Sequence, residues 1–117
     1  MKRVFATAFS ISLAMIAGVA LLGSGAAHAA LDKAQAEAMM TKYACAACHS
    51  IAKKIVGPAY VDVAAKYKAD KNAVELLSKK VKEGSVGVWG QIPMPPNASI
   101  PAADVKEIVT WILTLKK

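Results

Sequence analysis

The sequence predicts a small all-α domain of about four helices that follows an N-terminal targeting segment. Apolar residues recur at spacings of three and four at Val74, Leu77 and Val81, which is the period of an amphipathic helix, and a similar stripe runs along the last part of the chain. No stretch alternates apolar and polar residues for long enough to form a convincing strand, and no internal repeat is apparent. These observations favour helices packed around a single core.

The first 29 residues are typical of a secretory signal. Two basic residues precede an apolar run over residues 4–22, and Ala27-His28-Ala29 then supplies an A-x-A cleavage pattern. A retained membrane anchor is the alternative, because a run of 19 residues approaches the length of a membrane span. Polar and small residues dilute the run, so we predict a cleavable signal over residues 1–29 and a mature domain over residues 30–117, with cleavage after Ala29 or Ala30.

The predicted mature domain has 88 residues, with 13 lysines, 8 acidic residues, no arginine and a net charge of +5. The lysines are spread along the chain rather than gathered in one basic run, and nucleic-acid binding is therefore not expected. A chain this short builds only a small core, and such domains often need a covalent or metal cross-link.

Residues 31–47 are expected to form the first helix. Asp32 and Gln35 have the spacing of a capping box, and the alanines and methionines that follow have high helix propensity. A loop is expected over residues 50–58, where Gly57-Pro58 marks a turn.

Two short helices are expected to follow. The first of them spans Tyr60–Tyr67, and its apolar side is expected to consist of Val61, Ala64 and Ala65. The next opens at Asn72-Ala73-Val74-Glu75, which resembles a second capping box, and Gly84 is expected to end it.

Residues 85–100 contain several glycines and prolines and are expected to be irregular, and so long a loop in a small domain is usually functional. Pro101 can open the last helix. The buried stripe of that helix is expected to consist of Val105, Ile108, Val109 and Ile112, widened by Trp111 and Leu115.

Cys45-Ala46-Ala47-Cys48-His49 is the motif around which this chain is organised. It has the form C-x-x-C-H, which is the attachment pattern of c-type haem. Two thiols at this spacing can form thioether bonds with the two vinyl groups of one porphyrin, and the adjacent histidine then lies under the iron. A covalently bound haem would also supply the cross-link and the apolar core that a short domain needs.

The residues alone leave other readings of the motif open. In an exported chain, Cys45 and Cys48 could form a disulfide, which at this spacing makes sense only as a redox-active pair in an enzyme. With His49 they could instead contribute three ligands to a zinc site, although residues 30–117 hold no further cysteine or histidine. A haem without a second protein ligand would suit a sensor or a peroxidase.

The second axial position of a haem iron calls for a ligand other than histidine, because His49 is the only histidine of the mature domain. The candidates are Met39, Met40 and Met94. The first two lie on the first helix and are expected to fill the core. Met94 has a proline on each side, which restricts the backbone and fixes the direction of the thioether. We therefore expect His49 and Met94 to be the two metal ligands.

Together these segments resemble class I cytochrome c, and most closely its small bacterial cytochrome c-551, or c8, group. The resemblance rests on the C-x-x-C-H motif, Val56-Gly57-Pro58-Ala59-Tyr60, Gly87-Val88-Trp89-Gly90 and Ile92-Pro93-Met94-Pro95-Pro96-Asn97, in order and at matching spacings. It covers essentially the whole mature domain. It implies an all-α fold of about four helices wrapped around one haem c, bound covalently through Cys45 and Cys48, in a periplasmic carrier of electrons.

The same resemblance implies roles for four further residues. The carbonyl of Pro58 would accept a hydrogen bond from the ligand histidine, and Trp89 would donate one to a haem propionate. Lys80 would neutralise the propionates, and Asn97 would form a hydrogen bond near the sulfur of Met94. Tyr60 and Trp111 are expected to be packing residues.

Two positions depart from the family pattern. Met40 stands where the first helix usually carries an aromatic residue, which bears on how tightly the first and last helices pack. Ile100-Pro101-Ala102-Ala103 replaces the usual polar start of the last helix and gives a weaker N-cap.

The function expected from these residues is electron transfer without catalysis. Two protein ligands would fill both axial positions and leave no place for a substrate, so the chain is not expected to be an enzyme. The expected partners are redox proteins with acidic or mixed docking faces. The resemblance implies a donor such as a membrane cytochrome complex and an acceptor such as a nitrite reductase, a peroxidase or a terminal oxidase. Lys42, Lys53, Lys54, Lys66 and Lys68 lie near the haem-binding segments and would attract such faces. The mature protein is expected to be a monomer without stable membrane insertion.

Overall fold

The computed structural model describes residues 30–117, and the predicted signal peptide over residues 1–29 lies outside them. The described chain forms four α-helices and one 3-10 turn, namely α1 (Lys33–Lys42), η1 (Cys45–Ala47), α2 (Tyr60–Tyr67), α3 (Ala73–Glu83) and α4 (Ala102–Ile112). Residues 30–117 contain no strand, which confirms the all-α prediction. No helix in this part of the chain has the length and hydropathy needed to cross a membrane.

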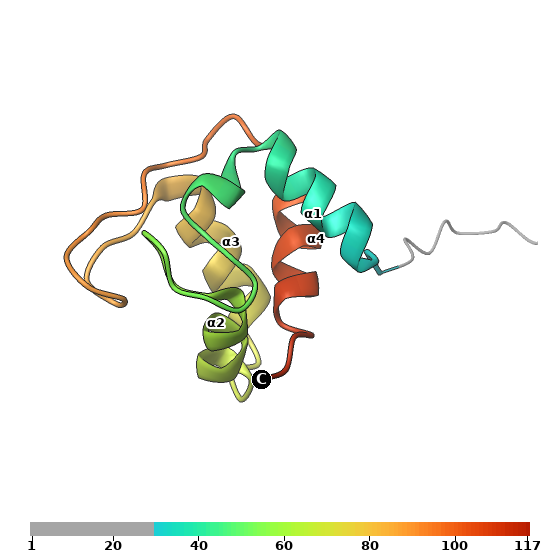
Figure 1. The fold of residues 1–117 in the computed structure, drawn as a ribbon. Helices are drawn as coiled ribbons and strands as arrows, with labels where there is room; N and C mark the ends of the chain where they lie inside the picture. The colour runs from blue at the N-terminus through green and yellow to red at the C-terminus, as the bar shows by residue number, and fades with distance from the viewer. Residues whose placement is uncertain (1–29) are drawn as a thin grey trace, which may run out of the picture.

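Helix α4 is the centre of the arrangement, since it packs against α1, α2 and α3. Figure 1 shows α1 crossing α4 near one end, with α3 beside α4 and α2 at the end where the chain terminates. In Figure 1 the connection over residues 48–59 and most of the one over residues 84–101 lie to the left of α1 and α4, and the second connection then runs over the top to the start of α4. This placement brings the C-x-x-C-H motif and the Met94 loop to the same side of the helices.

The capping box predicted for α1 is present. The backbone N–H of Gln35 donates to Oδ1 of Asp32 at 2.8 Å, and the backbone N–H of Asp32 donates to Oε1 of Gln35 at 2.9 Å. The predicted end of this helix at residue 47 is wrong, because α1 ends at Lys42. Ala44 adopts a left-handed conformation with φ +58°, which costs a residue with a Cβ about 1 kcal/mol and redirects the chain into η1.

The predicted face of α2 is only partly correct. Ala64 is buried as expected, but Val61 is half-buried and Ala65 is exposed. The buried positions follow the spacing of three and four and consist of Tyr60, Val63, Ala64 and Tyr67. The larger apolar area of the tyrosines decides which face turns inward, since alanine side chains contribute little burial energy.

Helix α3 begins without the predicted capping box. The side chain of Asn72 caps no backbone group, and its own backbone N–H instead donates to Oδ1 of Asp70 at 2.8 Å. The predicted end is correct, because Gly84 follows the last helical residue with φ +82°. Helix α4 begins after Pro101 without a side-chain cap, as the sequence indicated.

The core forms around α4, where α1, α2 and α3 pack against it. The predicted stripe of α4 is buried, and Trp111 is buried with it. Met40 retains only 3% of its surface exposed and joins the same cluster as Trp111. A methionine in place of an aromatic residue therefore still allows the first and last helices to pack, since its unbranched side chain fills irregular gaps.

Candidate functional site

A cavity of about 330 Å³ opens between the two long connections and helices α3 and α4. Its lining is largely apolar and includes Leu77 from α3 and Ile108 and Val109 from α4. The residues singled out from the sequence come from separate parts of the chain, and all eight line this one cavity: Cys45, Cys48, His49, Pro58, Lys80, Trp89, Met94 and Asn97. Met39 and Met40 are not among the lining residues.

The C-x-x-C-H motif folds as a tight turn. The carbonyl of Cys45 accepts hydrogen bonds from the backbone N–H groups of Cys48, at 3.1 Å, and of His49, at 3.0 Å. Both thiols are free. Burial raises the pKa of the Cys45 thiol, whereas the reactive cysteine of a thiol–disulfide enzyme has a lowered pKa. The environment of Cys45 therefore does not favour a redox-active pair.

Three neighbours hold the imidazole of His49 in place. Its Nδ1 lies 2.8 Å from the carbonyl oxygen of Pro58, and because a carbonyl can only accept, Nδ1 carries the proton and Nε2 keeps a free lone pair. The ring of Tyr60 stacks on the imidazole with centroids 5.1 Å apart. A Cβ at Gly57 would lie 2.5 Å from Cε1 of His49, so only glycine allows this approach.

Tyr60 lies between the cavity and the core and is buried. Burial raises the pKa of its hydroxyl far above the ordinary value, and nearby Cys45 and Cys48 raise it further. The hydroxyl is therefore neutral at any physiological pH. The sequence indicated packing for Tyr60, and the structure adds the stacking contact with His49.

Met94 reaches the cavity from the loop between α3 and α4. Ser85 and Met94 form an antiparallel bridge, in which the N–H of Met94 donates at 2.8 Å and the N–H of Ser85 donates at 3.1 Å. A Cβ at Gly84 would lie 2.7 Å from the carbonyl oxygen of Met94. Gly84 thus ends α3 and, because it has no side chain, also allows the backbone at Met94 to lie directly against the end of that helix.

The remaining predicted residues lie around the same cavity. Lys80 projects from α3, and Trp89 is partly exposed, with the Nζ of Lys66 5.6 Å from its ring centroid. The Nδ2 of Asn97 donates to the carbonyls of Pro95, at 3.0 Å, and Val81, at 3.3 Å. The hydrogen bonds of this amide therefore hold the loop that follows Met94.

Two features of the site were not visible in the sequence. Gly57 could be recognised only as part of a turn, and its contact with His49 depends on how residues 50–58 fold back. The contact between Lys66 and Trp89 joins α2 to a loop distant in sequence. A lysine and a tryptophan 23 positions apart form no sequence pattern that predicts such a contact.

The residues present fit a c-type haem. The two free thiols of Cys45 and Cys48 line the cavity, as attachment to the two vinyl groups of one porphyrin requires, and the tautomer of the adjacent imidazole leaves Nε2 available to iron. The wall provided by α3 and α4 is apolar and suits a flat hydrophobic ring. The missing Cβ at Gly57 leaves room for the ligand ring in this orientation.

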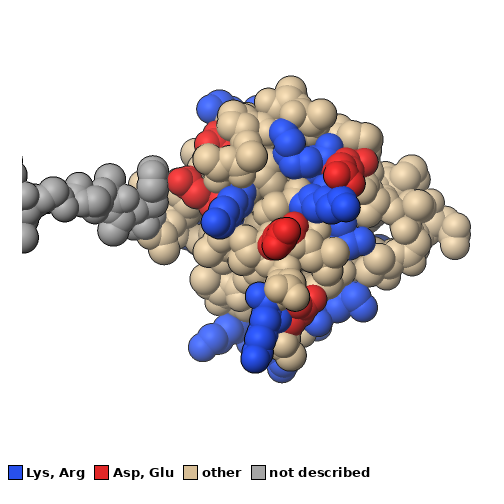
Figure 2. Space-filling model, turned by 180° about the vertical axis from the view of Figure 1, so that it is seen from behind, with Lys and Arg blue, Asp and Glu red and all other residues tan. Residues whose placement is uncertain are grey.

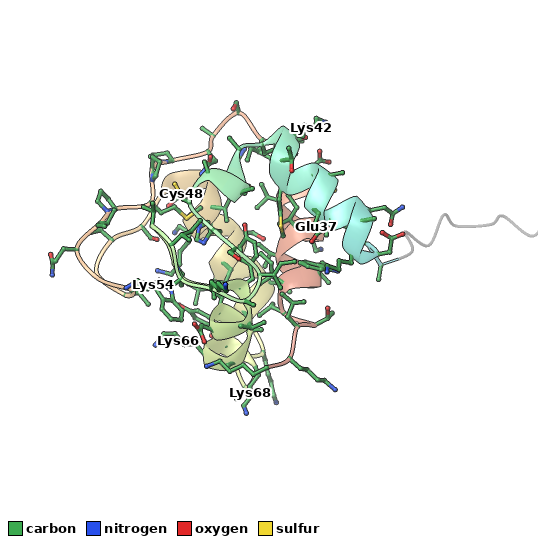
Figure 3. All side chains as sticks on the ribbon, in the orientation of Figure 1. Glu37, Lys42, Cys48, Lys54, Lys66 and Lys68 are labelled. Atoms are coloured by element: carbon green, nitrogen blue, oxygen red, sulfur yellow. The ribbon has the colours of Figure 1, made fainter. Side chains whose placement is uncertain are left out.

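Figure 3 places charged side chains around this region. Lys54 and Lys66 lie on the same side of the molecule as Cys48, and Lys42 projects from the end of α1. Lys54 lines the cavity itself. Seen from behind, lysines and acidic residues alternate over the helices, and the projecting part at the right of Figure 2 shows neither.

The comparisons with known proteins agree with this site. The family model described as Cytochrome c matches residues 33–116. The chain is 61% identical over 74 residues to cytochrome c-551 of Allochromatium vinosum, covering 63% of this chain and 79% of that protein. It is 49% identical over 104 residues to cytochrome c-552 of Nitrosomonas europaea, covering 89% of this chain and 95% of that protein. The crystal structure of wild-type Nitrosomonas europaea cytochrome c552 superimposes with a TM-score of 0.66 at 51% identity, covering 68% of this chain and 99% of the other.

These matches span the motif, the cavity and all four helices of the described chain. They therefore argue against two of the alternatives that the residues alone left open, a zinc module and a thiol–disulfide enzyme. The chain belongs to the cytochrome c family, among the small class I cytochromes that carry electrons on one covalently bound haem c.

Proposed function

We propose that this protein is a periplasmic electron carrier in which His49 and Met94 are the two axial ligands of the haem iron. The observation that carries the proposal is that both side chains line one cavity although 45 positions separate them in the sequence. Of the methionines at positions 39, 40 and 94, only Met94 lines the cavity.

Four neighbouring residues have roles in this proposal. Pro58 orients His49 and raises its basicity by accepting the Nδ1 proton. Lys80 supplies a positive charge, and Trp89 an indole N–H, for the haem propionates. Asn97 keeps the loop around Met94 in place through its two backbone acceptors.

When bound, haem supplies an iron that gains and loses one electron, and a thioether ligand favours Fe(II). With His49 on one axial position and Met94 on the other, no position remains for a substrate. Transfer of electrons without catalysis is therefore the function that this ligand set supports.

The N-terminal segment supports an exported protein. The alignment with Nitrosomonas europaea cytochrome c-552 covers 104 residues, more than the 88 residues from position 30 to the end, so it extends into the predicted signal. The protein would be released into the periplasm after cleavage, as a monomer.

The charge distribution supports redox partners with mixed docking faces. Residues 84–103 carry no charged side chain, so the whole connection over residues 84–101, which lines one side of the cavity, is neutral. Lys54 and Lys66 lie beside it and would attract acidic groups on a partner, such as a nitrite reductase, a peroxidase or a terminal oxidase.

Spectra of the haem-loaded protein test the ligand assignment. Wild type is expected to give a six-coordinate, low-spin c-type spectrum. Met94→Ala is expected to open the iron to cyanide or carbon monoxide and to lower the reduction potential, because axial ligands move haem potentials over a range of about 0.8 V. Met39→Ala and Met40→Ala are the controls and are expected to keep the wild-type spectrum. An unchanged spectrum and potential in Met94→Ala would contradict the proposal.

A further inference from the structure

Lys82 fastens the segment that follows Met94 to the end of α3. Its Nζ donates hydrogen bonds to the carbonyl oxygens of both Ala98 and Ile100. Ile100 is 4% exposed and lines the cavity, so the ammonium group holds a part of the cavity wall. The sequence does not distinguish Lys82 from the other lysines of the domain, because a lysine in the last turn of a helix normally needs no tertiary partner.

The other contacts of this segment show what Lys82 adds. Met94 is paired with Ser85, and the backbone N–H of Asn97 donates to the carbonyl of Val81 at 3.0 Å. Residues 81–85 thus hold residues 94–100 at three successive points, and the Lys82 contact is the one that secures the far end. It is also the only one of the three made by a charged group, and such hydrogen bonds are roughly twice as strong as neutral ones.

A neighbouring lysine on α3 behaves differently. The Nζ of Lys79 lies 4.0 Å from Oε2 of Glu83 on the same helix, and the Lys79 side chain is 68% exposed. This ion pair lies within α3, so Lys79 has the same charge as Lys82 and lies on the same helix, whereas Lys82 bonds the carbonyls at positions 98 and 100. Lys79 therefore provides a control for the general effect of removing a positive charge from α3.

We propose that Lys82 is a positioning residue for Met94, which holds residues 94–100 against α3 and so limits how often the Met94 side chain leaves the cavity. This inference rests on the proposed ligation by Met94. The ammonium group does not touch the ligand; it acts through the backbone at positions 98 and 100. Its loss should therefore change the rate of loop opening more than the spectrum of the closed state.

The test uses haem-loaded Lys82→Met, which keeps the length and apolar stem of the side chain and removes its donors. We expect cyanide to bind the ferric variant at least about tenfold faster than wild type, because the loss of a single hydrogen bond of ordinary strength already corresponds to about this factor. Lys79→Met should bind cyanide at the wild-type rate, and Lys82→Arg should restore slow binding because guanidinium can also donate to two carbonyls. Equal rates in Lys82→Met and wild type would overturn the inference.

Amide hydrogen exchange separates positioning from general destabilisation. In Lys82→Met, the amides of Met94, Asn97 and Ile100 should exchange about tenfold faster, while those of α4 stay at the wild-type rate. Faster exchange in α4 by the same factor would show a merely structural role and would reject the inference. This measurement does not depend on iron ligation, so it distinguishes failure of the Lys82 inference from failure of the Met94 assignment.

Discussion

The position of the His49 imidazole depends on the absence of a side chain at Gly57. Gly57 lies so close to this ring that the Cβ of alanine would meet Cε1, Nδ1 and Nε2 at 2.5, 2.9 and 3.0 Å. Because the distances to the two nitrogens are so little longer than the distance to Cε1, that Cβ would lie over the face of the ring rather than beyond its edge. The ring cannot move away freely, because Pro58 holds its Nδ1 and Tyr60 stacks on it.

Gly57→Ala should therefore displace the His49 ring and weaken its hydrogen bond with Pro58. We expect a loss of about 1–3 kcal/mol in the free energy of unfolding, the usual cost of an added methyl group in a tightly packed place. Chemical denaturation of the haem-loaded protein measures this loss, and the reduction potential reports the altered ligand. A variant with wild-type stability and potential would show that the ring has room to shift.

The residues of the candidate site could be named from the sequence, but most of their contacts could not. Cys45, Cys48 and His49 form a local motif whose spacing alone indicates haem attachment. Met94 could be proposed as a ligand because two prolines flank it and no second histidine competes, and the structure places it in the same cavity. The stacking of Tyr60 and the two bonds of Lys82 depend on how distant segments meet, and short-range patterns carry no information on that.

At the scale of elements, the beginnings of α1 and α3 offer a direct comparison. Both carry a sequence typical of a capping box, but only Asp32 forms the side-chain bond, whereas Asn72 makes none. The difference arises because Asp70 already accepts the backbone N–H of Asn72, which fixes the local turn differently.

Asp32→Ala should therefore lower the stability by about 1 kcal/mol, the usual contribution of an N-cap side chain. In a domain of this size that corresponds to a decrease in melting temperature of about 4–8 °C. Asn72→Ala is the matched control and should change the melting temperature much less, because it removes no cap. Thermal denaturation followed by circular dichroism decides the point, and equal losses in the two variants would refute the assignment.

The end of α1 shows where prediction by element fails. Residues 43–47 contain neither glycine nor proline, and helix propensity alone therefore predicts a helix that extends to residue 47. The chain instead turns at Ala44 with positive φ, a conformation for which alanine has no preference. Tertiary contacts outweigh the local helix propensity at this point. Because the helix ends before the motif, Cys45 and Cys48 both line the cavity.

At the scale of the whole molecule, the cavity and the core share their walls. Leu77, Ile108 and Val109 belong to the buried cluster and also line the cavity. The overall class and the number of helices could be predicted from periodicity and breakers, because these are properties of each segment alone. The shared wall could not, since it depends on how all four helices pack.

This shared wall predicts that the protein folds poorly when haem cannot be attached. The double variant Cys45→Ala/Cys48→Ala should fail to accumulate as a folded protein, because free energy is lost in proportion to the volume left unfilled in a core. Each single variant should keep at most one thioether bond. Circular dichroism and thermal melting of the purified double variant provide the measurement, and a helical protein that melts cooperatively would count against the prediction.

The neutral loop over residues 84–103 also bears on how long two proteins stay together. A partner that rests on it finds no charge with which to form an ion pair, so contact there adds little to the barrier for separation. Lysines at the side speed the approach, whereas residence time depends on the small apolar area that is covered. With this arrangement the association rate can be high while the complex remains weak. A protein that collects an electron from one partner and delivers it to the next needs both rapid association and rapid dissociation.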